Sequence, residues 1–331
     1  MTYPAPGSQE WLDLVVEEVV DPDRPIVDPH HHLWPPGGAL PYGLEDLLAD
    51  IRAGHSIVRT VFVECGSSYD HSAPAHLKSL GETRFVAGES ARDPGHLIGG
   101  IVAAADLRRA NLDDILDAHT EAGGSLFKGI RDALSSAEHP EALAIPGRAP
   151  RDLAFDPAFR RGVARLGDRG LTYDSWHYHY QNRDFLALAL AAPQTTMVLD
   201  HFGTPLGVGH YADQREAIKA QWRADIAEIA KCPNVVAKLG GLAMPDNGYG
   251  WHTAERPPTS DEFVAAQREW YLHTIDCFGP ERCMFESNFP VDRMSMSYLV
   301  VWNGFKKMVA DFSAAEQDAM LSGTATRAYR L

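Results

Sequence analysis

Residues 26–34 of this chain read IVDPHHHLW, a short β-rich run that ends in three histidines. Side chains alternate between the two faces of a β-strand, so His30 and His32 point to one side and His31 to the other. Two imidazoles on one face at the end of a strand can hold a divalent metal or polarise a carbonyl group. A histidine-rich turn without a role is the alternative, but three adjacent histidines do not help packing. We therefore expect chemistry at the end of this first strand.

Short β-rich runs of this kind recur along the chain, and helix-like segments separate them. The eight runs lie at residues 26–28, 57–64, 97–104, 126–130, 171–175, 196–200, 235–239 and 283–287. Apolar residues at three- and four-residue spacing mark helix-like segments that include 44–53, 112–122, 157–167, 183–190, 214–231 and 261–278. This alternation predicts a parallel sheet closed as a single-domain (β/α)8 TIM barrel of the α/β class. We expect residues 26–331 to form the barrel and residues 1–25 to form an N-terminal extension packed on it.

The composition argues against several kinds of partner. The 331 residues include 30 basic and 45 acidic side chains, and the formal charge of −15 repels nucleic acid and anionic membrane surfaces. No apolar run approaches the roughly 18 residues of a membrane helix. Residues 1–25 are acidic and lack the pattern of a secretory signal. The four cysteines are widely spaced, which predicts neither disulfides nor a structural zinc site. Together these features predict a cytoplasmic protein that acts on a small molecule.

Polar residues follow three other predicted strands. Glu64 ends the second run, Lys128 and Arg131 belong to the end of the fourth, and His201 follows the sixth. In a (β/α)8 barrel the active site lies at the C-terminal ends of the strands and on the loops that follow them. Each residue alone is a weak signal, because a glutamate there can cap a helix and a lone histidine is more often structural. Together they are expected to converge on one rim.

The fifth run continues into TYDSWHYHYQ at residues 172–181, which is dense in polar aromatic side chains. A buried strand end tolerates this composition poorly unless it lines a pocket. We therefore expect a substrate-binding wall that includes Trp176, His179 and Gln181. Alternation does not decide whether His177 or His179 faces inward, because the sequence does not fix the strand end to within two residues. Long loops at 65–76, 133–157 and 240–258 lie at the same rim, either as lids or as irregular surface.

Three motifs in order along the chain resemble the amidohydrolase-related family of the amidohydrolase superfamily. They are His-x-His at residues 30–32, Asp-His-x-Gly at residues 200–203 and Ser-Asn-Phe-Pro at residues 287–290. The resemblance extends over nearly the whole chain. The pieces Gly-Ile-Arg, Asp-His-Phe-Gly-Thr-Pro and Lys-Leu-Gly-Gly are most similar to the sugar lactonase and pyrone-dicarboxylate lactonase branch. Nearby relatives are decarboxylases and hydratase-like lyases.

The resemblance implies a hydrolase that opens a lactone or related cyclic ester of a small, anionic or polyhydroxylated substrate. It implies that His30, His32 and His201 surround the scissile carbonyl and that Arg131 holds the substrate's anionic or hydroxylated end, assisted by Lys128. The same three histidines either bind one divalent metal, Zn²⁺ or Mn²⁺, or act without a metal. The substrate's identity and the oligomeric state stay open, and a homo-oligomer is compatible with the sequence.

One position departs from the family's pattern. Where the family has the aspartate that activates water after the eighth strand, this chain has Asn288, and an asparagine cannot accept a proton. Asp292 is the first candidate to replace that base, followed by Glu64 or one of the two fifth-strand histidines. Alternatively, Asp292 caps the helix that begins near Met294.

Two rival functions use the same side chains. One is a metal-dependent decarboxylase or other carbon-carbon lyase of an aromatic acid. The other is a barrel that has lost catalysis at Asn288 and only binds a small carboxylic acid.

Overall fold

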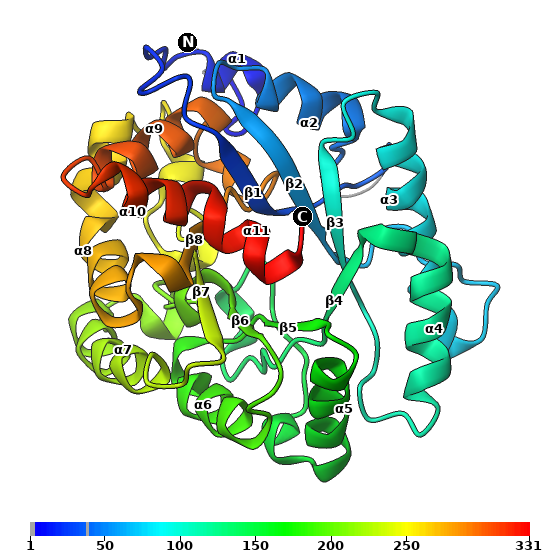
Figure 1. Cartoon of the computed structure of the whole chain (residues 1–331). Coiled ribbons are helices and arrows are strands. Elements are labelled where there is room, and N and C mark those ends of the chain that lie inside the picture. Colours follow the sequence, from blue (N-terminus) through cyan, green and yellow to red (C-terminus); the bar gives the residue numbers. More distant parts are fainter. Residues whose placement is uncertain (1–3, 38–39) are drawn as a thin grey trace.

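Eight strands alternate with helices in the computed structural model, which describes residues 4–37 and 40–331 (Figure 1). The strands are β1 (Ile26–His31), β2 (Ile57–Val63), β3 (Ile98–Ala103), β4 (Phe127–Arg131), β5 (Thr172–Ser175), β6 (Met197–Leu199), β7 (Val235–Leu239) and β8 (Cys283–Phe285). They pair in sequence order, and every neighbouring pair is parallel. A parallel bridge between His31 and Phe289 joins β1 to the segment after β8, so the sheet is nearly closed. The predicted single-domain TIM barrel is confirmed.

Helices surround the barrel (Figure 1). In the described ranges they are α1 (Gln9–Leu12), α2 (Leu44–Ile51), α3 (Leu80–Arg92), α4 (Leu112–Gly123), α5 (Pro157–Asp168), α6 (Asn182–Ala191), α7 (Arg215–Ile229), α8 (Ser260–Phe278), α9 (Tyr298–Met308), α10 (Ala314–Asp318) and α11 (Thr324–Tyr329). Local sequence sets where they begin. Asp156 accepts hydrogen bonds from the first amides of α5, and Thr259 and Glu262 form a capping box at the start of α8. None of these helices is long and apolar enough to cross a membrane.

The segment before β1 packs on the outside of the barrel. The fully buried Trp11 donates from Nε1 to the carbonyl of Ala254 (3.1 Å). The amide of Val20 donates to the side chain of Asn303 in α9 (2.8 Å). These contacts attach the chain's first elements to its last ones.

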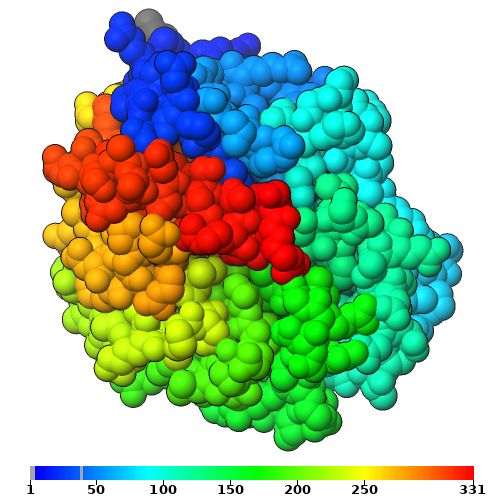
Figure 2. Space-filling model, viewed as in Figure 1, coloured from blue at the N-terminus to red at the C-terminus, as the bar shows by residue number. Residues whose placement is uncertain are grey.

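One end of the barrel is closed by the C-terminal helix. Alternate residues of the strands, including Val27, Val61 and Met284, form an apolar cluster with Tyr329 of α11. Figure 1 places α11 across the barrel, and Figure 2 shows the C-terminal segment in the middle of the same face. Lys128, near the start of β4, donates to the carbonyl of Arg330 (3.0 Å), so this is the N-terminal end of the strands. A functional site must therefore open at the opposite end.

Candidate active site

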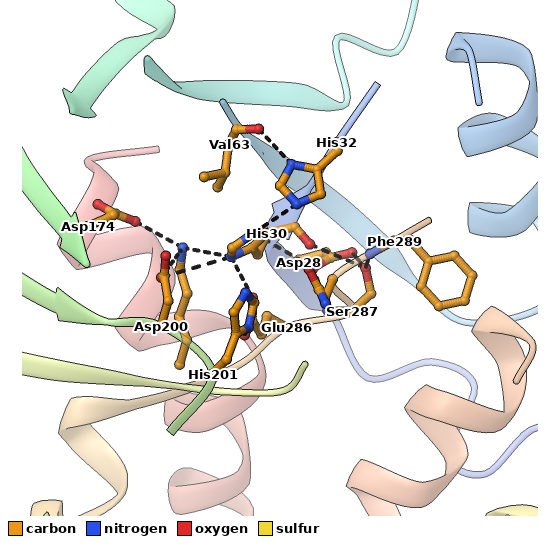
Figure 3. Close-up of polar contacts among 12 residues, drawn as sticks. Asp28, His30, His32, Val63, Asp174, Asp200, His201, Glu286, Ser287 and Phe289 are labelled. Atoms are coloured by element: carbon orange, nitrogen blue, oxygen red, sulfur yellow. Dashed lines mark hydrogen bonds and ion pairs between the residues drawn. The ribbon is translucent and has the colours of Figure 1, made fainter. Parts of the chain in front are cut away.

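Polar side chains from several strands meet at the C-terminal end of the barrel (Figure 3). His30 lies in β1, Arg131 ends β4 and His201 follows β6. The ring centroids of His30 and His201 are 4.6 Å apart, and Nη1 of Arg131 lies 3.5 Å from Nε2 of His30. The structure thus brings these three predicted residues together.

His30 and His32 face each other through their Nε2 atoms, which are 3.3 Å apart. Nδ1 of His32 lies 2.8 Å from the carbonyl of Val63, and a carbonyl only accepts, so this nitrogen carries the proton. Nδ1 of His30 lies 2.7 Å from Oε2 of Glu286. A lone pair facing a carboxylate oxygen at this distance would be repelled, so this nitrogen is also protonated. Its longer contact with Lys238 Nζ (3.3 Å) is the weaker one. Both Nε2 atoms then present lone pairs to each other.

Such a pair of facing lone pairs fits a cation. Burial is the main cause that holds the pKa of His30 and of His32 well below the ordinary value, so neither ring takes up a proton near neutral pH. A tetrahedral zinc ion with Zn–N bonds of about 2.0–2.1 Å separates two nitrogen ligands by about 3.3–3.4 Å. The observed separation of the two Nε2 atoms matches that value.

Asp200 adds an oxygen donor to this region. His30, Asp200 and His201 are all buried, and each offers a ligand atom within 4.8 Å of the others. Among the described residues, neither carboxylate oxygen of Asp200 has a hydrogen-bond partner, although Oδ1 is within ion-pair distance of Lys238 (3.1 Å). The donor set suits a divalent metal. It adds Asp200 to the predicted set of His30, His32 and His201.

Glu286 orients two of the histidines. Its fully buried carboxylate lies 2.6 Å from Nδ1 of His201 and 2.7 Å from Nδ1 of His30. Burial alone would lower the pKa of His201, but the carboxylates of Glu286 and Asp200 reverse this and its pKa lies above the ordinary value. Gly241 leaves room for the ring, since a Cβ there would lie 2.2 Å from Nδ1 of His201. The other ring nitrogen, Nε2, is left to face the barrel mouth.

A buried lysine lies beneath the histidines. Nζ of Lys238 in β7 contacts Asp174 (2.9 Å) and Asp200 (3.1 Å), and all three side chains are fully buried. The hydroxyl of Tyr329 also donates to Asp174, which links this network to α11. The sequence analysis did not assign a role to Lys238 or Glu286. Alternation along β7 and β8 could have placed both inside the barrel.

A cavity of about 300 Å³ opens above the histidines. Six of the predicted site residues line it: His32, Glu64, Arg131, Trp176, His201 and Asn288. Its walls come largely from the loops that follow the strands, which supply Trp34, Ile145, Met244 and Val291. His30 lies below this floor, in contact with His32. The long loops expected at this rim therefore form the walls of the cavity.

Arg131 is engaged by Glu64. Its Nε donates to Oε1 of Glu64 (2.8 Å) and its Nη2 donates to the Glu64 carbonyl. The Arg131 side chain is 8% exposed. Its charge is thus compensated within the protein.

Three residues predicted to bind substrate do not line the cavity. Lys128 lies at the closed end of the barrel, where it binds the carbonyl of Arg330. Gln181 uses both ends of its amide to hold the 133–157 loop, donating to Leu134 (2.7 Å) and accepting from Ser136 (3.1 Å). Nδ1 of His179 accepts from the amide of Leu206 (3.3 Å). Lys128 lies near the opposite end of β4 from Arg131, and His179 and Gln181 lie in a 3-10 helix after β5, so the structure does not bring these three side chains to the cavity.

His177 does not line the cavity either. It contacts Ser175 through Nδ1 (2.9 Å) and Asn182 through Nε2 (3.1 Å). Of the fifth-strand wall, Trp176 alone reaches the cavity within the described residues.

Asn288 and Asp292 form a buried pair. Nδ2 of Asn288 donates to Oδ1 of Asp292 (2.9 Å), and the amide of Ala243 donates to Oδ2 (3.3 Å). The Asp292 carboxylate bonds to neither Met294 nor Ser295, so the capping alternative is wrong. Asp292 does not line the cavity, which also argues against the direct base role expected for it. Burial is the main cause that raises the pKa of Asp292 to about 7. Asp292 therefore positions Asn288, which does line the cavity.

Asn288→Asp is expected to destabilise the protein, because it places two carboxylates at hydrogen-bond distance. The pair then shares a proton and its pKa in the folded state rises above the unfolded value. The loss of unfolding free energy relative to the wild type is small near pH 4 and grows as pH rises toward the raised pKa. It amounts to about 2–4 kcal/mol at about pH 8. Urea unfolding at both pH values measures it. The swap Asn288→Asp/Asp292→Asn should recover at least half of the loss, and equal stability of wild type and Asn288→Asp at the higher pH would contradict the pairing.

The chain is similar to known proteins over most of its length. The sequence model of the amidohydrolase family matches residues 27–331. The uncharacterised protein y4mH of Sinorhizobium fredii is 32% identical over 93% of this chain and 99% of its own length. An L-fucono-1,5-lactonase of Burkholderia multivorans is 29% identical over 77% of this chain and 83% of its own length. A crystal structure of an amidohydrolase from Burkholderia multivorans with bound zinc is 26% identical, with a TM-score of 0.73 over 92% of this chain and 99% of that chain. The protein described here belongs to the amidohydrolase family.

Proposed function

We propose that this amidohydrolase opens a lactone or related cyclic ester by attack of water on the ring carbonyl. The observation that carries the proposal is the buried histidine cluster, held by Glu286, at the floor of a cavity at the C-terminal ends of the strands. Polar groups fixed in a dry site stabilise the charge that develops on a carbonyl oxygen in the transition state. The similarity to a lactonase from Burkholderia multivorans supports a lactone as the substrate.

Glu64 is the proposed general base. Among the described residues that line the cavity it is the only carboxylate. Arg131 holds its Oε1, which leaves Oε2 to accept a proton from the attacking water. Asn288 donates from Nδ2 to Asp292, so its Oδ1 is available to orient that water. His32 and His201 face the carbonyl from the floor.

A divalent metal fits the same site and is part of the proposal. His30, His32 and His201 would hold it, with Asp200 as an oxygen donor beside them. Bound there, a metal would polarise the lactone carbonyl and lower the pKa of a water molecule. The amidohydrolase from Burkholderia multivorans that was crystallised with zinc makes Zn²⁺ the first metal to test.

A turnover screen tests the proposed reaction. The purified protein is offered a panel of lactones and of aromatic acids, while acid release and CO₂ are followed and the bound metal is measured by elemental analysis. We expect acid release from lactones and no CO₂. Release of CO₂ would indicate a lyase, and thermal stabilisation by the compounds without turnover would indicate a binding protein. Either result would overturn the proposal.

Glu64→Gln tests the assignment of the base. Glutamine still accepts from Arg131 but cannot take a proton, so kcat is expected to fall by about 100-fold with a smaller change in KM. Glu228→Gln on the exposed surface of α7, where Glu228 pairs with Lys231, is the matched control and should leave both constants unchanged. A Glu64→Gln variant with half of the wild-type kcat would exclude Glu64 as the base.

A further inference from the structure

The walls of the active-site cavity are apolar, whereas its polar groups gather at the floor. The walls include Trp34, Ile145, Trp176, Met244 and Val291, which come from the ends of four strands and from the loop after β4. Met244 and Val291 are buried, with exposed fractions of 6% and 4%. The volume of about 300 Å³ is at the lower end of the range for small-molecule pockets. The cavity therefore suits a compact ligand with an apolar body.

Arg131 is the only lysine or arginine among the described residues that line this cavity. Arg131 is paired with Glu64 through Nε (2.8 Å). A second cavity of about 340 Å³ lies alongside and shares Glu64 and Arg131; Arg108 lines that second cavity and does not line the apolar walls of the first. Removing a carboxylate from water without a cationic partner is unfavourable. A substituent with a carboxylate is therefore disfavoured against the apolar walls, which lie away from the histidines of the floor.

The walls also offer few partners for hydroxyl groups. Each buried hydroxyl needs a hydrogen bond, and leaving one unmade is unfavourable. Nε1 of Trp176 is buried and has no hydrogen-bond partner within residues 4–37 and 40–331. This atom has no accessible surface, so it does not offer a donor to a ligand in the cavity. A sugar lactone with several hydroxyl groups would leave most of them unpaired.

We propose that the substrate is an uncharged, compact lactone whose ring carries an alkyl or aryl substituent, with its carbonyl at the histidines and the substituent against the apolar walls. The proposal rests on the proposed lactone hydrolysis and narrows its substrate class. It departs from the anionic or polyhydroxylated substrate expected from the sequence, because Arg131 is occupied by Glu64.

The test compares lactones of one ring size that carry a phenyl, an alkyl, a carboxylate or a polyhydroxylated substituent. The initial rate of acid release gives kcat/KM for each. The phenyl or alkyl lactone should exceed the carboxylated and polyhydroxylated ones by about 10-fold or more, the scale on which an apolar pocket discriminates. A higher kcat/KM for the carboxylated or polyhydroxylated compound would overturn the inference but leave lactone hydrolysis standing. No acid release from any of the four would instead count against the proposed function.

Ile145→Asn places an amide in the apolar wall. It should lower kcat/KM for the phenyl lactone by about 10-fold and lower kcat/KM for the polyhydroxylated lactone much less. The ratio of the two kcat/KM values should therefore decrease. The matched control is Leu190→Asn on α6, where the side chain is 66% exposed to solvent, and it should change neither value. If Ile145→Asn left the ratio of kcat/KM for the phenyl and polyhydroxylated lactones unchanged, the substituent would not lie against this wall. That result would overturn the inference.

Discussion

His32→Ala is expected to lower kcat/KM for lactone opening by about 1000-fold, the upper end of the effect of removing one group that stabilises an oxyanion. The reason is the position of its Nε2, which lies 3.3 Å from His30 Nε2 at the floor of the cavity. The carbonyl of Val63 fixes the ring through Nδ1 (2.8 Å), so no other side chain can replace it without moving the backbone. Initial rates with the best lactone measure the loss.

His31 provides the matched control, because it is the neighbouring histidine on the opposite face of β1. Its Nε2 lies 3.0 Å from Oγ1 of Thr60, away from the cavity. His31→Gln should keep kcat/KM within about threefold of the wild type, although it costs some stability. The metal content of the purified variants is a second readout, and it should fall for His32→Ala only. A His32→Ala enzyme with a tenth or more of the wild-type rate would show that the histidine floor is misplaced.

Lys238→Met is expected to reduce the free energy of unfolding by about 3–5 kcal/mol at neutral pH, the cost of removing one partner of a buried ion pair. The ammonium group contacts Asp174 (2.9 Å) and Asp200 (3.1 Å), and none of the three side chains is exposed. Burial alone would lower the pKa of Lys238, but these carboxylates hold it above the ordinary value. Without the cation, both buried carboxylates lose their nearest positive charge. Their folded-state pKa values then rise, so the loss of stability grows as pH rises from about 4 toward neutrality.

Urea unfolding at several pH values measures this effect. Lys128→Met is the matched control, because Lys128 donates to the neutral carbonyl of Arg330 and its loss should cost only about 1 kcal/mol. The double variant Lys238→Met/Asp174→Asn removes one of the uncompensated charges and should recover part of the stability. If Lys238→Met and Lys128→Met reduced the free energy of unfolding equally, the stabilising role of the buried ion pairs of Lys238 would be contradicted.

The fold could be predicted from the sequence because it depends on local patterns. Eight short β-rich runs separated by amphipathic segments leave few arrangements other than a parallel barrel. The same logic placed His30 and His32 on one face of β1 and brought Arg131 and His201 to the same end of the barrel. Alternation and strand polarity are properties of the backbone, so the sequence alone determined them.

Tertiary structure decided which charges face one another. Lys128 and Lys238 are both lysines of barrel strands, yet one lies at the closed end and the other beneath the histidines. Their surroundings depend on position along the strand and on the register between neighbouring strands, which a single sequence does not specify.

The same reason explains the remaining differences from expectation. The pairing of Arg131 with Glu64 joins residues far apart in the chain, and the pairing of Asn288 with Asp292 depends on the turn between them. Residue types and strand ends determined where the candidate site lies. Distances between side chains from different strands decided what each group can do there, because a charge is free to bind a ligand only when no neighbour within the fold already compensates it.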